Sequence, residues 1–453
     1  MLVMAKIKTK FICQNCNANY GKWVGRCDNC EQWNTLLEQV VSEAEAKTAL
    51  AKGAISGKKL DTISVNKIVP TDMKSRLDTG FLELNAVLGG GILLGSVALL
   101  AGQPGIGKST LLMQIASRVA AQKPVLYVSG EESASQVKLR AVRLGASSDQ
   151  LHFASSTSGN DIATTIAAGK YDLVIVDSIQ TLSLSEISSA PGTVSQVSNC
   201  GNLIIRAAKA TDTAVIIVGH VTKDGALAGP KALEHLVDVV LNFEGDRYGG
   251  FKTVRAAKNR FGSTTEVAIF EMGQNGLAEV KNPSAALLAE RQNTDGSIIL
   301  STIEGTRPIL VEIQALVNPT SFGYPKRTAS GFDLNRLNLL VAVLEKRTKL
   351  KLQDKDIFIN VVGGLKISDA AADLAVCMAI ASATAGRKLD DSLVVFGEVG
   401  LGGEIRSALQ PERRLAEAKK LGFTGAIAPT TIKDRFVLPV TDLRTALIKY
   451  MAR

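Results

Sequence analysis

The segment 102–110 restricts the possible folds of this chain more than any other feature of its sequence. It fits the pattern G-x4-G-K-[ST] in full, follows the short apolar run VALLA at 97–101, and precedes an apolar helical pattern. Glycines let the backbone curl so that its N–H groups point at phosphates, and the start of the helix adds partial positive charge. We therefore predict that the segment cradles the phosphates of ATP. The predicted contact residues are Gly102, Gln103, Pro104, Gly105, Ile106, Gly107, Lys108, Ser109 and Thr110.

Two residues of this loop and one distant aspartate are suited to neutralising charge at the nucleotide. We expect Lys108 to reach the β- and γ-phosphates and Ser109 to ligate Mg²⁺. The strand-like run LVIVD ends at Asp177, and an acidic residue at the carboxyl end of a central strand can hold the Mg²⁺ shell. A solvated aspartate at a strand end is the alternative, which the upstream loop disfavours.

Hydrolysis also requires a group that orients water at the γ-phosphate. Glu131 and Glu132 follow the strand-like run VLYVS and Gly130. Of the two we choose Glu131 and interpret Glu132 as a helix cap or a solvated surface residue, because a carboxylate base needs position rather than an unusual pKa. His220 ends the run AVIIVGH and is a candidate γ-phosphate sensor, although a capping or core role accounts for a single histidine about as well.

Short β-branched runs alternate with helical patterns between residues 70 and 282. The runs VALLA, VLYVS, LVIVD and AVIIVG are almost continuously apolar, which is typical of parallel strands buried on both faces. We predict an α/β domain with a central, mostly parallel sheet over 70–282. Residues 283–453 mix strand-like and helical patterns without a repeat, and we predict that they form a separate α/β domain.

Four of the six cysteines lie within the first 30 residues. They form two CxxC pairs: Cys13 with Cys16, and Cys27 with Cys30. A CxxC pair directs two thiolates at one ion from a tight turn, and four thiolates complete the tetrahedral shell of Zn²⁺. We predict a zinc-binding module over 1–35, in which Trp23 and Trp33 are placed to cover the metal. A pair of redox dithiols is the alternative.

Composition excludes several classes of protein. Of the 453 residues, 46% are apolar and 21% are charged, which argues against wholesale disorder and, at this length, suggests two or three domains. No apolar run reaches the roughly 18 residues of a membrane span. The start, MLVMAKIKTKF, has lysines where a signal peptide has its apolar core, and six cysteines are too few for a disulfide scaffold, so we expect a cytoplasmic protein. Residues 36–69 are rich in Ala, Lys, Glu, Ser and Gly and are predicted to be a linker.

Four segments resemble the ATPase core of the RecA superfamily: GQPGIGKST, LYVSGEES, VIVDSIQ and VGHVTKDG. The pentapeptide KNRFG at 258–262, together with the four-cysteine cluster, is similar to the bacterial RadA (Sms) family, and the resemblance spans nearly the whole chain. It implies a ring-forming DNA motor, hexameric like DnaB-type helicases, that promotes branch migration on single-stranded and branched DNA with a RecA-type recombinase as partner. The resemblance also implies that Lys258 and Arg260 reach the γ-phosphate of a neighbouring subunit. If the resemblance is set aside, both residues are interpreted as ordinary basic side chains at the exposed end of a strand.

The C-terminal part resembles the proteolytic domain of Lon, in the stretches KISDAAADLAVCMAIASA and GEVGLGGEIRSALQPERRLAEAKKLGF. Lon cleaves peptides with a Ser–Lys dyad; the serine position aligns with Ala371 and the lysine position with Glu412. The resemblance therefore implies a Lon-like fold without peptidase activity. The run KRTKLKLQDK at 346–355 has five basic residues and one acid, and either contacts a phosphate backbone or is a solvated helix end.

Three further functions compete with an ATP-driven DNA motor. A recombination mediator would use ATP as a switch, without motor activity. A protein-directed ATPase would turn over without DNA, and an ATP-dependent protease is disfavoured by Ala371 and Glu412. The formal net charge of +9 mildly favours a polyanionic partner, and the sequence alone does not decide whether the zinc module contacts DNA or protein.

Overall fold

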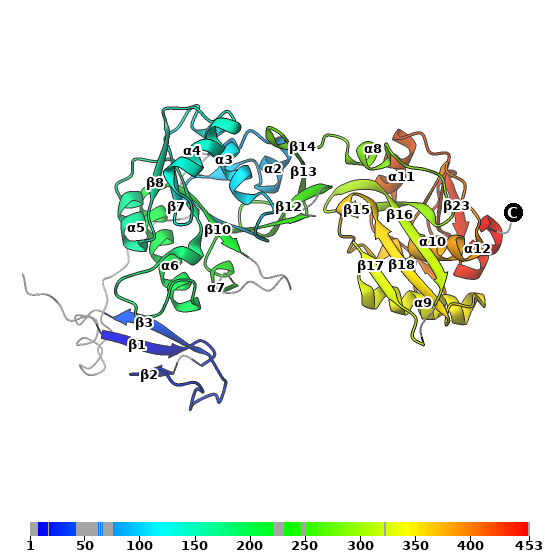
Figure 1. The fold of residues 1–453 in the computed structure, drawn as a ribbon, viewed down its shortest axis with the longest axis horizontal. Helices are drawn as coiled ribbons and strands as arrows, with labels where there is room; N and C mark the ends of the chain where they lie inside the picture. The colour runs from blue at the N-terminus through cyan, green and yellow to red at the C-terminus, as the bar shows by residue number, and fades with distance from the viewer. Residues whose placement is uncertain are drawn as a thin grey trace, which may run out of the picture. The chain divides into compact units, whose positions relative to one another are not determined.

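The computed structural model describes residues 8–16, 18–41, 62, 64, 66, 76–220, 231–245, 250–320 and 323–451. The chain divides into two compact units, each described here by itself (Figure 1). The first contains Met1–Phe243 and Ala256–Ser263, and the second contains Glu244–Arg255 and Thr264–Arg453. The division passes through a strand, β12, rather than through the predicted boundary between residues 282 and 283, and the domain bounds of the sequence analysis stay a prediction.

The N-terminal module is a small antiparallel sheet in the order β2-β1-β3. Its strands are β1 (Lys8–Cys13), β2 (Asn19–Tyr20) and β3 (Leu36–Val41). Strand β3 corrects the predicted linker: residues 36–41 pair with β1 over its whole length, from Cys13↔Leu36 to Lys8↔Val41. Most of the remaining linker prediction, and the loop 221–230 after His220, lie outside the described residues.

The core of the first unit is built on six parallel strands of a nine-stranded sheet, in the order β11-β6-β10-β9-β7-β8. Its strands are β6 (Val97–Gly102), β7 (Val125–Ser129), β8 (Leu151–Ser155), β9 (Leu173–Asp177), β10 (Ala214–His220) and β11 (Val239–Gly245). Strands β6, β7 and β9 are buried at every residue, as their almost continuous apolar runs predict. Because all six strands run in one direction, their carboxyl ends meet at one edge of the sheet.

Helices cover both faces of this sheet. The helices and short elements of the core are β4 (Arg76–Leu77), α2 (Leu82–Val87), β5 (Ile92–Leu93), α3 (Lys108–Val119), α4 (Ala134–Arg143), α5 (Gly159–Ala167), η3 (Ile179–Thr181), α6 (Val194–Thr211) and α7 (Lys231–Glu234). Side chains of α5 and α6 pack on the sheet face that carries Val97 and Leu99, and those of α2 and α3 on the face that carries Ala98 and Leu100. The sheet is therefore the middle layer of three.

The second unit is a mixed α/β domain around a seven-stranded sheet in the order β17-β18-β16-β15-β19-β22-β23. Strand β12 (Phe251–Asn259) is divided between the two units at residue 255. The other strands of this unit are β13 (Val267–Gly273), β14 (Gly276–Glu279), β15 (Ser297–Glu304), β16 (Arg307–Pro319), β17 (Arg327–Ser330), β18 (Lys355–Val361), β19 (Leu393–Val395), β20 (Glu398–Val399), β21 (Ile405–Arg406), β22 (Gly425–Pro429) and β23 (Val437–Val440). The helices are α8 (Pro283–Leu288), α9 (Leu334–Thr348), η4 (Val362–Gly364), η5 (Ala370–Ala372), α10 (Asp373–Ala385), α11 (Pro411–Lys420) and α12 (Leu443–Met451). Helix α10 is apolar on all sides and is buried at its first ten residues, so it forms the centre of this core.

The architecture confirms the predicted α/β fold class: an N-terminal module with a four-cysteine cluster, a P-loop core around a mostly parallel sheet, and a C-terminal mixed α/β domain. The RecA-like and Lon protease-like character of the last two parts stays what the sequence resemblance implies. Among the helices that the structure describes, none combines the length and the apolar character needed to cross a bilayer.

Candidate nucleotide and metal sites

The phosphate-binding loop connects β6 to α3 at the carboxyl edge of the sheet. Gly107 caps α3 with a left-handed φ of 117°, a conformation that strongly favours glycine. At Gly102 a Cβ atom would lie 2.7 Å from the carbonyl oxygen of Phe243 in the neighbouring β11. Two glycines of the motif are thus required by backbone geometry, and the strand–loop–helix prediction is confirmed.

Lys108 lies at the base of the loop with only 4% of its surface exposed. Its Nζ donates hydrogen bonds to the carbonyl oxygens of Gly102 at 2.8 Å and Gln103 at 2.9 Å. Burial lowers the pKa of Lys108 to about 8, against the opposing attraction of Asp177 and Glu131. The loop therefore holds the buried ammonium group of Lys108 near the carboxylates of Asp177 and Glu131.

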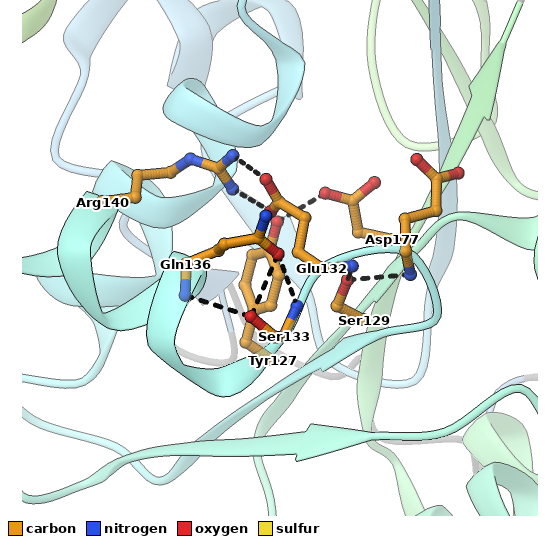
Figure 2. A network of polar contacts seen from close by, with 8 residues as sticks. Tyr127, Ser129, Glu132, Ser133, Gln136, Arg140 and Asp177 are labelled. Atoms are coloured by element: carbon orange, nitrogen blue, oxygen red, sulfur yellow. Dashed lines mark hydrogen bonds and ion pairs between the residues drawn. The ribbon is translucent and has the colours of Figure 1, made fainter.

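Asp177 ends β9 and is buried at the same edge of the sheet. The phenol of Tyr127 donates a hydrogen bond of 2.6 Å to its Oδ2 atom, as Figure 2 shows, and burial together with this carboxylate raises the pKa of Tyr127 well above its usual value. Ser109, half-buried, follows Lys108 in the first turn of α3. A carboxylate and a hydroxyl oxygen are ligands that Mg²⁺ accepts, so these two residues fit the predicted ion.

The two adjacent glutamates after β7 have different surroundings. Glu132 forms a two-pronged ion pair with Arg140 of α4 (Figure 2), and its backbone N–H is bound by Ser129. Among the described residues no arginine or lysine forms an ion pair with Glu131: its Oε1 accepts a 2.5 Å hydrogen bond from the Ser178 hydroxyl and lies 3.4 Å from Nε2 of His220. Glu132 is therefore held in an ion pair with Arg140. The side chain of Glu131 is 43% exposed and lies at the carboxyl edge of the sheet, next to the phosphate loop.

His220 meets Glu131 at the end of β10. Its Nε2 faces the carboxylate, and its Nδ1 is buried without a hydrogen-bond partner in the described part of the chain. Its sensor role stays a prediction. Ser178, which sequence reasoning missed, is identified only by its contact with Glu131.

Lys258 lies at the end of β12 and is engaged within its own chain. Its Nζ donates to the carbonyl oxygens of Glu234 at 2.8 Å, His235 at 3.2 Å and Val237 at 2.8 Å. An ammonium group has three N–H donors, so these contacts use all of them. Burial, with a smaller contribution from the neighbouring charge of Arg260, lowers the pKa of Lys258. To reach a phosphate, this side chain must first leave the turn that follows α7.

Other residues of the pentapeptide 258–262 also contact residues of the first unit. Arg260 pairs with Asp238 at 3.2 Å, and its side chain is 53% exposed. The amide of Asn259 donates to the Val87 carbonyl at 3.0 Å, and a Cβ atom at Gly262 would lie 2.8 Å from Cα of Gly89. The pentapeptide was the sequence signal for these contacts. The sequence did not indicate that Asn259 binds a carbonyl about 170 residues upstream, at the end of α2.

The four cysteines of the N-terminal module converge. Their sulfur atoms all lie within 4.8 Å of one another, and the shorter pairs, Cys13–Cys30 and Cys16–Cys27, are 3.5 Å apart. A tetrahedron of thiolates with bonds of about 2.3 Å to Zn²⁺ has sulfur–sulfur distances of about 3.8 Å, so the cluster fits this ion. The tryptophans that were predicted to cover the metal are largely exposed, Trp23 at 56% and Trp33 at 69%, and neither belongs to the buried cluster around the cysteines.

The turn before α10 is where the Lon resemblance places a nucleophile. Ala371 is buried there, and its N–H donates to Asp369. Glu412, which the resemblance places at the lysine position, is exposed in the first turn of α11, whereas Arg414 is buried and pairs with Asp369 at 2.7 Å. Residue 414, not 412, points into the fold because the helix turns by about 100° per residue. An arginine cannot serve as a base.

Three family models match separate parts of the chain: the P-loop core, the four-cysteine module and the C-terminal domain. The family model described as AAA domain matches residues 67–226, Rubredoxin metal binding domain matches 11–38, and Subunit ChlI of Mg-chelatase matches 338–432. "DNA repair protein RadA" of Halalkalibacterium halodurans is 47% identical over 443 residues, which cover 97% of this chain and 96% of that protein. The Bacillus subtilis protein of the same description is 47% identical over 96% of this chain and 95% of its own length.

A third relative and one solved structure extend the comparison. "DNA repair protein RadA" of Haemophilus influenzae is 46% identical over 98% of this chain and 99% of its own length. A crystal structure of the RadB recombinase aligns with 45% of this chain and all of its own, at 22% identity and a TM-score of 0.37.

Proposed function

The chain belongs to the family of RadA DNA repair proteins, and from this premise we propose that it is an ATP-driven motor that moves on single-stranded DNA and promotes branch migration of recombination intermediates. The observation that carries the proposal is the group of side chains at the carboxyl edge of the parallel sheet. Lys108 begins α3, Glu131 follows the end of β7, and Asp177 and His220 end β9 and β10, so four segments bring these side chains to one edge of the sheet. Positioning and charge neutralisation are what phosphoryl transfer to water requires.

The proposed chemistry is attack of water on the γ-phosphate. Glu131 orients the water and accepts its proton, while Ser178 and His220 hold the carboxylate in position. Lys108 exchanges the two loop carbonyls for phosphate oxygens and stabilises the negative charge that develops on them. Ser109 and Asp177 would hold Mg²⁺, which neutralises phosphate charge when bound. His220 links the state of this site to the chain that follows β10.

We further propose that the chain works as a ring, with a hexamer as the expected size. In a ring, Lys258 and Arg260 reach the nucleotide of the neighbouring subunit, where cations supplied across an interface stabilise the transition state. Because Lys258 is bound to three carbonyls of its own chain, assembly has to replace these hydrogen bonds. This exchange supports a mechanism in which hydrolysis depends on the presence of a neighbour.

The proposed partners are single-stranded and branched DNA and a RecA-type recombinase. The Lon-like domain takes part without peptidase activity, because the buried Ala371 offers no nucleophile and the neighbouring cation, Arg414, cannot be a base. Its role is to position DNA and neighbouring subunits.

The proposal predicts that single-stranded DNA raises the rate of ATP hydrolysis several-fold, and that Lys258→Ala lowers the stimulated rate by at least about 10-fold. The measurement is steady-state phosphate release by the full-length protein, with and without DNA, together with nucleotide affinity, which the variant retains. Lys138→Ala, which removes an exposed lysine of α4, is the matched control and keeps the wild-type rate. Turnover that is indifferent to DNA would point instead to a protein-directed ATPase.

A second prediction concerns the basic run at the end of α9. Lys346, Arg347 and Lys349 are all exposed. Cations at a helix C-terminus also interact favourably with the helix dipole, so their position alone does not require DNA. If they contact phosphates, reversing all three to Glu weakens binding of single-stranded DNA by at least about 10-fold at low salt. The slope of log affinity against log salt then becomes less steep by roughly 2, since each contact contributes about 0.7.

The control for this patch reverses three exposed basic residues elsewhere in the same unit: Lys366, Lys388 and Arg435. It changes net charge by the same amount, so it separates a local contact from a general loss of positive field. Equal salt slopes in the two triple variants would reject the patch.

A further inference from the structure

We propose that Trp23 and Trp33 of the zinc ribbon form a platform on which bases of single-stranded nucleic acid stack. The proposal rests on the proposed function and assigns part of its DNA contact to the N-terminal module. It starts from an anomaly: the chain has only two tryptophans, both lie in this module, and they are 56% and 69% exposed. Indoles carry a large apolar surface that proteins usually bury.

The module does not need these side chains for its own core. Its buried cluster consists of Cys13, Cys27 and Leu36, with Phe11, Tyr20 and Val24 among the partly buried residues that pack on it. Neither tryptophan belongs to this cluster. Two large apolar side chains that the fold leaves exposed are more easily explained by a ligand than by stability.

The two indoles converge on the same spot of the surface. A Cβ atom placed at Gly25 would lie 3.5 Å from Cη2 of Trp23 and 3.7 Å from Cζ3 of Trp33, so the benzene edges of both rings meet over this glycine. The backbone beneath them is tied to the second CxxC turn, because Asn34 N–H donates to the Gly25 carbonyl at 2.8 Å and Cys27 N–H to Gln32 at 2.9 Å. The zinc site therefore presents the rings on a fixed support.

The charge of the N-terminal segment suits a polyanion better than an apolar protein surface. Residues 1–35 contain five Lys or Arg and two Asp or Glu, a net charge of +3, which comes from Lys6, Lys8 and Lys10 ahead of the cysteines, whereas residues 20–35 are neutral. Lys22, next to Trp23, is exposed, whereas one of the two acids, Glu31, is neutralised by Arg26 at 2.6 Å. Aromatic faces beside cations are the usual means of holding single strands without reading their sequence, because every base has a flat face to stack.

The chain supplies its own probe for this contact. Since both tryptophans lie in the proposed platform, indole fluorescence, excited where tyrosine does not absorb, reports on it alone. We expect oligo(dT) to quench the fluorescence of the full-length zinc-loaded protein by about half or more, in a saturable titration. A duplex of matched length, whose bases are already stacked, is expected to quench much less.

Substitutions connect the signal to affinity. Trp23→Ala and Trp33→Ala are each expected to weaken binding of labelled oligo(dT), followed by anisotropy, by about 5- to 100-fold, and Trp33→Phe by less. Bound zinc is measured in every variant to show that the module is folded. Tyr324→Ala, which removes a 91% exposed aromatic of the second unit, is the control and leaves affinity unchanged.

The possible outcomes separate this proposal from the proposed function. If oligo(dT) binds and stimulates ATP hydrolysis while the fluorescence and the affinities of both tryptophan variants stay unchanged, the platform is wrong and the motor stands. If quenching follows the addition of a RecA-type recombinase but not of DNA, the surface is a protein-docking site and the proposal is overturned. If the protein does not bind DNA at all, both the stacking platform and the DNA motor are contradicted.

Discussion

Replacing Glu131 with Gln is expected to lower the rate of ATP hydrolysis by at least about 100-fold while nucleotide binding is retained. Glutamine keeps the size of the side chain and its hydrogen bond from Ser178, but it cannot accept a proton from water. The charge that His220 faces is lost as well. Single-turnover hydrolysis and nucleotide affinity, measured on the same preparation, distinguish a loss of chemistry from a loss of binding.

The adjacent residue supplies the control for this substitution. Glu132→Gln changes the same chemical group one position along the chain, but it removes the ion pair with Arg140 at partly buried positions. We expect a loss of stability of about 1 kcal/mol or less and a hydrolysis rate within a few-fold of the wild type. If Glu132→Gln abolished hydrolysis and Glu131→Gln did not, the roles assigned here would have to be exchanged. If both variants remained active, the base would lie elsewhere.

Removing zinc is expected to unfold the N-terminal module and nothing else. With three buried side chains at its centre, the module has almost no apolar core, so metal binding supplies most of its folding free energy, about 10 kcal/mol or more in comparable peptides. After treatment with a chelator, limited proteolysis should cut within residues 8–41, while the thermal unfolding of the remainder is unchanged.

Cysteine variants test the same point without a chelator. Cys27→Ser should lose bound zinc and make the module protease-sensitive. Cys200→Ala is the matched control: Cys200 is buried in α6, where burial raises the pKa of its thiol to about 12, so it stays protonated and binds no metal. Zinc content is measured directly in each variant. A module that stays protease-resistant after its zinc has demonstrably been removed would contradict the prediction.

The parts of the site that could be predicted from sequence are those in which the chemistry is local. The phosphate loop is one contiguous segment, and its glycines satisfy steric requirements at Gly102 and Gly107. The two CxxC pairs direct their sulfur atoms by turn geometry alone, and an almost continuously apolar strand such as LVIVD indicates a sheet buried on both sides. Such patterns span a few residues, so they keep their meaning in any surrounding structure.

The direction of a side chain toward a distant segment could not be predicted in this way. Only the fold separates Glu131 from Glu132, because Arg140 and His220 come from different elements. The same holds for Arg414, which pairs with Asp369, and for Asn259, which binds a carbonyl at the end of α2. It also holds for the two tryptophans that the sequence placed over the metal and the fold leaves exposed.

The nucleotide loop, the candidate zinc ligands, the α/β class and the family could therefore all be predicted from the amino-acid sequence. The fold was needed to show which of two neighbouring carboxylates lacks an ion pair with an arginine, which cations are bound within their own chain, and which aromatic rings are exposed. Covalent spacing constrains groups within one turn or one loop. Hydrogen bonds and packing between segments that are tens to hundreds of residues apart depend on how helices and strands are placed against one another, which no local pattern specifies.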